Sequence, residues 1–411
     1  MSNSPEVLHF IGIGGSGASA VAALAQAAGY QVTGCDLDTS SNYLKDLSTI
    51  AISQGHAPAH INKVDLVVVS PAILSLDADN EELKAAHNKK IPLMTWQEFM
   101  GKFLQKDKFV IAVAGTHGKS TTCAMIGMIL EAAGLDPTVE VGAIVRQWGK
   151  NYRLGQGKYF VCEADEFNDN FLNYYPDLAV ITNIEFDHPE YFQNEQQLQT
   201  SFAKFISQVK SGGRVLRTSE VAKVKYNLSI PGEFNQDNAS LAAACAQQLG
   251  IDELVIKSAL ENFSGVGRRF EQVGEVDGVK VFDDYAHHPT AIVKTLQAFR
   301  QKFSNEKIFC VFQPHMFSRT RALFDDFVKA FQNAPVDEVI VVDIFASREK
   351  ATGRVTSRQL VEAIGKDHVK YLSSLEAAYN WLKSRLVPGS IVVCMGAGDI
   401  NKLSRKLVNN E

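Results

Sequence analysis

The chain has 411 residues, of which 45% are hydrophobic and 21% charged, and its formal net charge is −5. This length favours two or three domains, and the composition is that of an ordinary globular protein. The acidic balance argues against nucleic acid or an anionic membrane surface as a partner. No apolar run approaches the length of a membrane span, and no secretory signal is visible at the N-terminus. The six cysteines lie far apart, which favours reduced, mostly buried thiols of a cytoplasmic protein over a disulfide or zinc framework.

The first segment, residues 1–107, alternates strand and helix patterns. An apolar run over 7–13 leads through glycines into an alanine-rich helix that extends to Ala28. A second strand pattern over 31–35 ends at Asp36, and a third covers 64–70. This alternation predicts an α/β domain with a mainly parallel sheet and ligands at the carboxyl ends of its strands.

The glycines after the first strand match a dinucleotide-binding fingerprint, with Asp36 at the expected distance. Glycines at a helix N-terminus receive any diphosphate, so a UDP-linked substrate fits as well as NAD does, and a purely structural turn is the third possibility. A stronger nucleotide site follows later in the chain, which favours the UDP-linked substrate. The predicted substrate-binding residues here are Gly12, Gly14, Gly15, Ser16, Gly17, Asp36 and Ser70.

The second segment, residues 108–265, opens with the most informative motif of the chain. An apolar strand pattern over 109–114 turns through glycines into a helix, which is the arrangement of a triphosphate-binding loop. The loop is tighter than the usual one. Lys119 would reach the terminal phosphates and Ser120 would bind Mg²⁺. The predicted ATP-contacting residues are Gly115, Thr116, His117, Gly118, Lys119, Ser120 and Thr121.

Carboxylates follow the next strand patterns of this segment. Glu163 lies at the end of a buried strand and is the better candidate for a Mg²⁺ ligand, whereas Asp165 and Glu166 are interpreted as solvated loop charges. Asn183 and Asp187, with His188, follow another buried strand and predict a functional loop.

Two further motifs end the second segment. Asn235 and Asn238 are three residues apart in a helical pattern and could read an adenine edge, or one of them could simply cap the helix. Arg268 and Arg269 lie at the expected hinge, where an arginine suits charge developing on a transferring phosphoryl group.

The third segment, residues 266–411, repeats the strand–helix alternation, and its polar residues gather at strand ends. His287 and His288 follow two aspartates and resemble a transition-metal site, but zinc is disfavoured because no spaced partner ligands are visible. His315 with Arg319 follows a second strand, and Asp343 a third. Such a collection on one sheet edge indicates a site.

Taken together, these motifs resemble the Mur ligases of peptidoglycan synthesis. The resemblance runs in order through GIGGSG, SPAI, AGTHGKSTT, EADE, TNIEFDH, GRRF, DDYAHHPT, FQPHMFSRT and MGAGDI. It implies a Rossmann-like domain for a UDP-sugar (1–107), a central P-loop ATPase-type domain (108–265) and a C-terminal Rossmann-like domain for the amino acid (266–411). The implied reaction is ATP-dependent joining of L-alanine to the lactyl carboxylate of UDP-N-acetylmuramate through an acyl phosphate.

The resemblance also implies roles for single residues. Lys119, Arg268, Arg269 and His288 would be catalytic. The residues associated with Mg²⁺ would be Ser120, Glu163 and His188. Glu163 and His188 would also be catalytic. Asn235, Asn238 and Asp343 would contact the nucleoside, and His287, His315 and Arg319 the amino acid and the reacting carboxylate.

The chain departs from the family pattern at three places. Phe167-Asn168 replaces a Ser-Asp pair, Met316 stands where a basic residue is common, and residues 211–230 look shortened, as if a β-rich piece were missing. Slower turnover or altered regulation is expected from these changes, not loss of activity.

Three alternatives remain at this stage. The first is the recycling ligase of the same family, which joins a whole tripeptide to the same sugar. The second is an NAD-dependent oxidoreductase with a regulatory nucleotide site, and the third is a non-catalytic ATP-binding switch. The amino-acid preference and the oligomeric state are not determined by the sequence.

Overall fold

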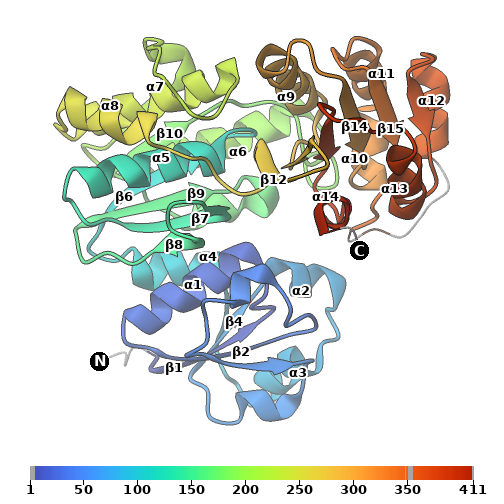
Figure 1. The fold of residues 1–411 in the computed structure, drawn as a ribbon. Coiled ribbons are helices and arrows are strands. Elements are labelled where there is room, and N and C mark those ends of the chain that lie inside the picture. The colour runs from blue at the N-terminus through green and yellow to red at the C-terminus, as the bar shows by residue number, and fades with distance from the viewer. Residues whose placement is uncertain (1–4, 348, 350–354, 410–411) are drawn as a thin grey trace. The chain divides into compact units, whose positions relative to one another are not determined.

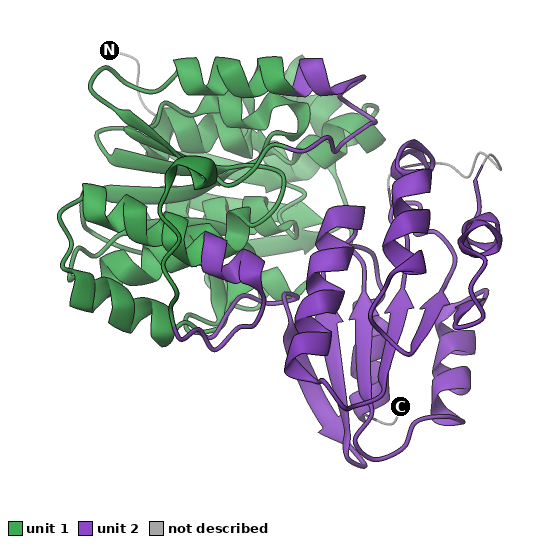
Figure 2. Ribbon diagram, turned by 90° about the horizontal axis from the view of Figure 1, so that it is seen from above, with its two compact units in different colours: residues 1–184, 199–226, 238–263 green, residues 185–198, 227–237, 264–411 purple. Residues whose placement is uncertain are grey.

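The computed structural model describes residues 5–347, 349 and 355–409, and it divides into two compact units (Figure 2). The first unit holds residues 1–184, 199–226 and 238–263, and the second holds 185–198, 227–237 and 264–411. Three sheets of mainly parallel strands alternate with helices along the chain, so the predicted three-domain α/β fold class is confirmed (Figure 1). The first two sheets share one compact unit, so the division into units does not test the predicted boundary between the first and second domains. The predicted domain boundaries remain predictions. Across the described part of the chain, no helix is both long and apolar enough to cross a membrane.

The first sheet has five parallel strands in the order β3-β2-β1-β4-β5. Side chains alternate between its two faces, so neighbouring residues of one strand pack against different helices. Phe10 contacts Phe99 on one face, while Ile11 joins an apolar cluster with Ala85 on the other. The elements are β1 (Val7–Ile11), α1 (Ser16–Ala27), β2 (Gln31–Asp36), η1 (Asn42–Leu44), β3 (Ala51–Gln54), η2 (Pro58–Ile61), β4 (Leu66–Val69), α2 (Pro71–Leu76), α3 (Glu81–Asn88), β5 (Leu93–Thr95), α4 (Trp96–Phe99) and η3 (Met100–Leu104).

The second sheet has six strands in the order β11-β10-β6-β9-β7-β8, and only its edge strand β8 is antiparallel among the described pairs. Its central strands are continuous apolar runs, as expected where helices cover both faces of a parallel sheet. The elements are β6 (Phe109–Ala114), α5 (Lys119–Ala132), β7 (Thr138–Val145), β8 (Lys150–Arg153), β9 (Tyr159–Ala164), η4 (Phe167–Asn173), β10 (Leu178–Ile181), α6 (Glu195–Ser207), β11 (Arg214–Arg217), η5 (Thr218–Glu220), α7 (Glu233–Gln248) and α8 (Glu253–Glu261).

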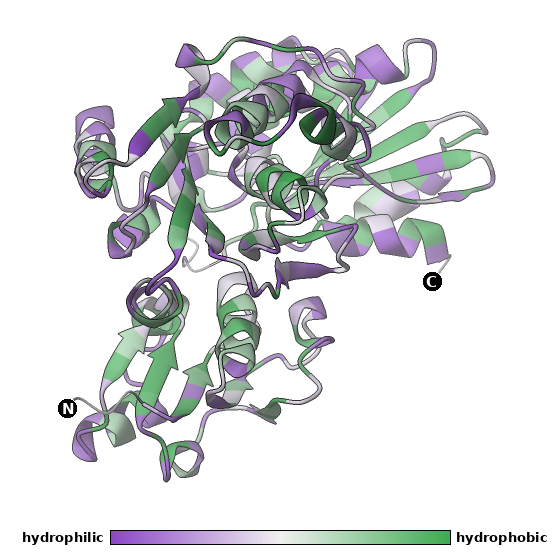
Figure 3. Ribbon diagram, turned by 90° about the vertical axis from the view of Figure 1, so that its left-hand side faces the viewer, coloured by the Kyte–Doolittle hydropathy of each residue, from purple (hydrophilic) through white to green (hydrophobic). Residues whose placement is uncertain are grey.

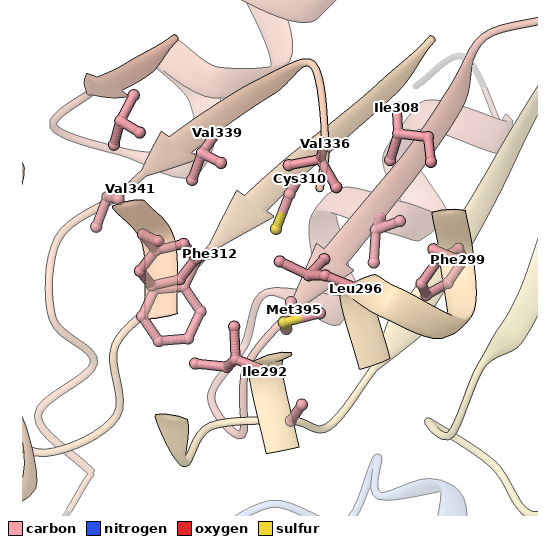
Figure 4. Packing of buried hydrophobic residues seen from close by; sticks show 14 of the residues in the cluster. Ile292, Leu296, Phe299, Ile308, Cys310, Phe312, Val336, Val339, Val341 and Met395 are labelled. Atoms are coloured by element: carbon pink, nitrogen blue, oxygen red, sulfur yellow. The ribbon is translucent and has the colours of Figure 1, made fainter. Parts of the chain in front are cut away.

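The third sheet has six strands in the order β12-β13-β17-β14-β15-β16, and β12 pairs antiparallel with β13. One face is covered by α9, α11 and α12, whose Leu296, Phe327 and Leu360 join one core cluster. Figure 4 shows Leu296 of α9 in this cluster, together with Cys310 and Met395 of the sheet. The other face is covered by α13 and α14. The elements are β12 (Glu271–Val276), β13 (Val279–Asp284), α9 (Pro289–Lys302), β14 (Ile308–Phe312), α10 (Phe317–Ala322), α11 (Phe324–Gln332), β15 (Glu338–Val341), α12 (Ser357–Ile364), β16 (Val369–Tyr371), α13 (Leu375–Lys383), β17 (Ile391–Met395) and α14 (Asn401–Asn409).

The strands predicted from long apolar runs are all present, whereas the edge strands and one inner strand, β7, were missed. The hydropathy colouring shows why: the inner strands are hydrophobic along their length, while helix surfaces alternate (Figure 3). β3, β8 and β12 carry mixed or polar sequences, since an edge strand buries less of its surface.

Candidate functional site

The loop between β6 and α5 is held open by its glycines and by Asn183. Gly115 and Gly118 have φ values of +133° and +87°, which side-chain-bearing residues rarely adopt. A Cβ at Gly115 would lie 2.1 Å from Oγ1 of Thr182. Asn183 accepts from the backbone N–H of His117 through Oδ1 (3.0 Å) and donates to the carbonyl of His117 (2.9 Å). The loop is therefore preorganised, with its concave side at the N-terminus of α5, where phosphate binds in such folds.

Lys119 lies at the first position of α5, and its ammonium group makes two hydrogen bonds. Its Nζ donates to the carbonyl of Gly115 at 2.7 Å and to Oε2 of Glu166 at 2.8 Å. Burial would lower the pKa of Lys119, but the charge of Glu166, with that of nearby Asp165, outweighs burial and raises it. Glu166 is only 1% exposed, so its prediction as a solvated loop charge was wrong. A carboxylate so deeply buried needs a charged partner, and Lys119 supplies one.

Two of the three predicted magnesium ligands, Ser120 and Glu163, lie together, and the role predicted for the third, His188, remains a prediction. Oγ of Ser120 donates to Oε2 of Glu163 at 2.9 Å, and the same oxygen accepts from the backbone N–H of Gly142 at 2.8 Å. Glu140 is buried beside them, and burial, reinforced by the negative charge of Glu163, raises its pKa well above the usual range. A hydroxyl and a carboxylate beside a phosphate loop are the oxygen donors that Mg²⁺ prefers, so these residues fit the ion.

The two asparagines both lie within α7, which begins at Glu233, so the alternative that one of them caps the helix was wrong. Both are buried. Oδ1 of Asn238 lies 2.5 Å from the position of a Cβ on Gly118, so this amide packs against the phosphate loop. Nδ2 of Asn235 donates to the carbonyl of Pro231 at 2.6 Å.

The glycines of the turn after β1 have different structural roles. Gly14 donates its N–H to Oδ2 of Asp36 at 2.8 Å, which ties the turn to the end of β2. A Cβ on Gly12 would lie 3.0 Å from Cβ of Ser70, so these two predicted residues are neighbours. A Cβ on Gly17 would lie 2.3 Å from the indole of Trp96, so Gly17 is needed for packing of α1. Gly15 immediately precedes α1 and Ser16 begins it.

In the second unit, Arg319 and Asp187 form a buried ion pair. Nε of Arg319 donates to Oδ1 of Asp187 at 2.8 Å, and both side chains are nearly inaccessible. Burial would raise the pKa of Asp187, yet the positive charge of Arg319 holds it well below its usual range. His315 lies beside the pair, with Nδ1 3.2 Å from Nη1 of Arg319. The sequence placed Asp187 in a functional loop, but only the structure reveals it as the partner of Arg319.

The adjacent histidines have different surroundings. Nδ1 of His287 lies 2.9 Å from the carbonyl of Tyr285 and so carries the hydrogen, which leaves Nε2 as an acceptor. Burial and the charge of Arg319 hold the pKa of His287 well below its usual range. His288 caps α9: Nδ1 accepts from the N–H of Thr290, and Nε2 lies 3.2 Å from the carbonyl oxygen of Phe186. The catalytic role predicted for His288 remains a prediction.

The hinge arginines flank one aromatic ring. The guanidinium groups of Arg268 and Arg269 each lie 4.9 Å from the ring centre of Tyr285. Arg268 also donates to Oδ2 of Asp283 (3.1 Å) and to the carbonyl of Gly396 (2.8 Å). Among the described residues, the Arg269 side chain makes no hydrogen bond.

Three other predicted positions lie in the second unit. Nδ1 of His188 lies 3.1 Å from Oε1 of Glu190, and the φ of His188 is +56°. Asp343 is exposed and accepts from the hydroxyl of Tyr371 at 2.7 Å. Met316 is buried with a φ of +71° and immediately precedes α10. An apolar side chain suits that buried position.

Three residues near the sites were missed or misjudged by sequence reasoning: Glu140, Glu166 and Tyr285. An acidic residue inside the apolar run of β7 was a usable signal for Glu140, because an isolated charge in a buried strand requires a function or a partner. No comparable signal marked Tyr285 as the ring shared by the two arginines.

The chain combines a phosphate loop, a hydroxyl–carboxylate pair beside it and three α/β sheets. This combination defines a nucleotide-dependent multidomain enzyme. The chain belongs to the Mur ligase family. Sequence profiles match for the Mur ligase family catalytic domain (residues 7–108), the Mur ligase middle domain (113–220) and the Mur ligase glutamate ligase domain (268–398).

Similar proteins cover nearly the whole chain. The UDP-N-acetylmuramate–L-alanine ligase of Alkaliphilus metalliredigens is 36% identical, with 98% of this chain and 96% of that protein covered. That of Clostridium acetobutylicum is 37% identical over 98% and 97% of the two chains. The crystal structure of the UDP-N-acetylmuramate–alanine ligase of Thermotoga maritima matches with a TM-score of 0.83 at 27% identity, covering 99% of each chain. A murein peptide ligase from Psychrobacter arcticus shares the fold, with a TM-score of 0.71 at 23% identity and 98% of each chain covered.

Proposed function

We propose that this chain joins L-alanine to the lactyl carboxylate of UDP-N-acetylmuramate, with ATP as the energy source, in the cytoplasm. The observation that carries the proposal is its likeness, end to end, to proteins named for that reaction. Membership of a ligase family favours this reaction over a hydride transfer at the glycine turn. The two glycine loops then serve different ligands: the turn at 12–17 takes the UDP-sugar, and the loop at 115–121 takes ATP.

The ATP site is supported by the geometry of the central domain. The backbone N–H groups of the loop and the Lys119 ammonium face the place where the β- and γ-phosphates of ATP would bind. Ser120 and Glu163 would hold Mg²⁺, which, when bound, offsets charge on the phosphates. An ammonium has three N–H donors, so Lys119 would keep its bond to Glu166, which orients it, and turn another N–H to the phosphates.

The chemistry begins with attack of the lactyl carboxylate on the γ-phosphorus of ATP, which breaks the bond to the β-phosphate oxygen and releases ADP. The carboxylate oxygen thereby becomes the bridge of an acyl phosphate. The amine of alanine then attacks the acyl carbon, expels phosphate and forms the amide. Activation is necessary because a free carboxylate is a poor acylating agent at neutral pH.

The C-terminal domain supplies groups suited to alanine. Arg319, although paired with Asp187, presents a guanidinium that suits the amino-acid carboxylate. Nε2 of neutral His287 is an acceptor and can take a hydrogen bond, or a proton, from the amine. An amine must lose its proton before it attacks, so a histidine with a lowered pKa is well suited to this step.

Arg269 is the better candidate for the phosphate contact that the hinge arginines were predicted to make. The carboxylate of Asp283 and the carbonyl of Gly396 already occupy Arg268. Arg269 is held through the face of Tyr285, which leaves its N–H groups available for a phosphoryl group.

The test is a product assay. Purified protein is incubated with ATP, Mg²⁺, UDP-N-acetylmuramate and an equimolar pool of amino acids, and the UDP-linked product is analysed by mass spectrometry. We expect a mass increase corresponding to alanine, with one phosphate released per product. Omission of the sugar should abolish phosphate release, and equal release without it would refute the ligase proposal.

A second arm tests the acyl phosphate and the alternative substrate. With ¹⁸O in the lactyl carboxylate, one labelled oxygen should appear in the released phosphate. If the L-alanyl-D-glutamyl-containing tripeptide were joined while free alanine was not, the recycling activity would replace our proposal.

A further inference from the structure

A second group of metal-binding side chains lies in the first sheet, and one of its members, Cys35, borders the glycine turn through its carbonyl, which accepts from the backbone N–H of Gly12 at 2.9 Å. It comprises His9 on β1, Cys35 on β2, His60 in η2 and Glu82 on α3. His9 pairs with Thr33 and Ile11 with Cys35 in the parallel register, so His9 and Cys35 project from the same face of the sheet. α3 covers that face through Ala85 and Ala86.

The four side chains converge on one point. Nε2 of His9, Sγ of Cys35, Nδ1 of His60 and an oxygen of Glu82 all lie within 4.8 Å of one another. Sγ of Cys35 is 3.4 Å from Nε2 of His9 and 3.0 Å from Oε2 of Glu82. Bonds of 2.0–2.3 Å to a tetrahedral ion imply ligand–ligand separations of roughly 3.3–3.7 Å. The His9–Cys35 and His9–Glu82 separations fit such an ion as they stand, the Cys35–Glu82 separation must open by a few tenths of an ångström, and Nδ1 of His60, 2.5 Å from Oε1 of Glu82, must move away by about 0.8 Å.

His9 is oriented by a hydrogen bond on its far ring nitrogen, so that Nε2 points into this cluster. The Thr33 hydroxyl directs its hydrogen to the carbonyl of Leu8 (3.3 Å), so its oxygen accepts from Nδ1–H of His9 at 2.8 Å. Nε2 of His9 lies on the opposite side of the ring and faces Oε1 of Glu82 at 3.7 Å. A hydrogen bond on the other ring nitrogen is the usual partner of a metal-bound histidine.

Charge and burial favour a divalent ion there. Glu82 and Cys35 are fully buried and His9 is 2% exposed. One divalent cation with a thiolate, a carboxylate and two neutral imidazoles has no net charge, which suits a buried position. His60, with 21% of its side chain exposed, offers a path for entry.

We propose that His9, Cys35, His60 and Glu82 bind one Zn²⁺ ion in tetrahedral geometry. Binding forms four metal–ligand bonds, with Cys35 losing its thiol proton to solvent and the metal remaining in one oxidation state. Sulfur and imidazole nitrogen select zinc over Mg²⁺, which separates this site from the oxygen ligands at Ser120 and Glu163. His56, with Nδ1 3.1 Å from Oε2 of Glu82, donates to the liganding carboxylate from outside. Cysteine spacing could not reveal this site, because three of its ligands are not cysteines.

The test uses metal alone. Full-length protein is stripped with a chelator, dialysed against ZnCl₂ in excess MgCl₂ and analysed for bound zinc. We expect one zinc per chain, with a rise in Tm on zinc addition. CoCl₂ in place of zinc should give the thiolate-to-cobalt absorption of a sulfur ligand.

Matched variants decide the assignment. Cys35→Ser should lower zinc affinity by at least about 100-fold and remove the cobalt–thiolate band. His60→Asn, at the exposed edge, should lower affinity while leaving the metal-free fold intact. His87→Asn, an exposed histidine on the same α3 helix, should change neither. Equal zinc uptake by Cys35→Ser and the parent, or a cobalt spectrum without the thiolate band, would overturn the proposal and leave a metal-free hydrogen-bonded network.

Discussion

At the scale of single residues, the sites depend on buried charges that come in pairs. Lys119 with Glu166, Arg319 with Asp187 and Arg268 with Asp283 each join a cation to a carboxylate that is almost inaccessible. Breaking such a pair from one side leaves a buried charge uncompensated, so stability and catalysis are affected together. Tests of these residues therefore need variants that separate the two effects.

Lys119→Ala should abolish turnover, lowering it by about 10³-fold or more, because it removes the charge that would stabilise the transferring phosphoryl group. It should also destabilise the fold by about 3–5 kcal/mol, since Glu166 loses its partner. Adding Glu166→Gln should restore much of the stability but not the turnover. Phosphate release and thermal unfolding measure the two effects, and binding of UDP-N-acetylmuramate should persist in the stable double variant. Recovery of activity in the double variant would show that Lys119 is only structural.

The hinge arginines should respond differently to truncation. Arg269→Ala should lower kcat by about 10²- to 10³-fold with a smaller fall in Tm than Arg268→Ala, since its side chain rests on the ring of Tyr285 and acts on the buried Asp284 through its charge, without a hydrogen bond. Arg268→Ala should lower Tm markedly, because the buried carboxylate of Asp283 loses its partner. The reverse pattern, measured by steady-state kinetics and calorimetry, would assign the phosphate contact to Arg268.

Asp283 should make stability fall as pH rises. Burial raises its pKa to about 6, although the adjacent Arg268 acts in the opposite direction. Between the ordinary value near 3.8 and 6, the folded state holds a proton that the unfolded state has released, so the free energy of unfolding decreases with increasing pH. The loss between pH 5 and pH 8 should be about 1 to 1.5 kcal/mol.

Asp283→Asn removes this titration and keeps an acceptor for Arg268. The parent should therefore lose about 1 to 1.5 kcal/mol of unfolding free energy between pH 5 and pH 8 that the variant does not lose. Urea denaturation of both proteins at pH 5, 6.5 and 8 measures this difference. Parallel pH profiles of variant and parent would exclude a raised pKa at Asp283.

At the scale of elements, the glycine turn after β1 combines binding with packing. Gly17→Ala should cost about 1–3 kcal/mol, because its new methyl group meets the indole of Trp96 and displaces α1 or α4. Gly15→Ala is the matched control, because its Cβ would meet only the carbonyl of Gly12 at an ordinary 3.7 Å. Thermal unfolding should separate the two variants. Equal Tm values would mean that the indole can move aside without cost.

At the scale of the whole molecule, the proposal assigns each ligand to its own part of the chain. Hydrogen exchange can test this assignment with the intact protein. UDP-N-acetylmuramate alone should slow exchange around 12–17 and 34–38, ATP around 115–121, and alanine, added last, around 285–288 and 315–319. Protection of the same peptides by the sugar and by ATP would refute the presence of two nucleotide sites.

The relatives also show that this chain is short for its kind. The alignment with the Alkaliphilus protein spans 451 positions although the chain has 411 residues, so at least 40 positions have no residue here. This is consistent with the predicted loss of a piece from the central domain, whose place at 211–230 remains a prediction. The phosphate-loop contacts of Lys119, Ser120 and Asn183 are nevertheless complete.

Local sequence signals were sufficient to predict the fold class, most of the inner strands and the phosphate loop. Their signals are local: an apolar run of strand length, glycines where φ must be positive, and a lysine and a serine at fixed offsets. Only the tertiary structure decided which charges are paired, as Glu166 and Asp187 show, and how His9, Cys35, His60 and Glu82 meet. These contacts join residues from 22 to more than 130 positions apart, and no local pattern specifies which side chains converge when strands and helices pack.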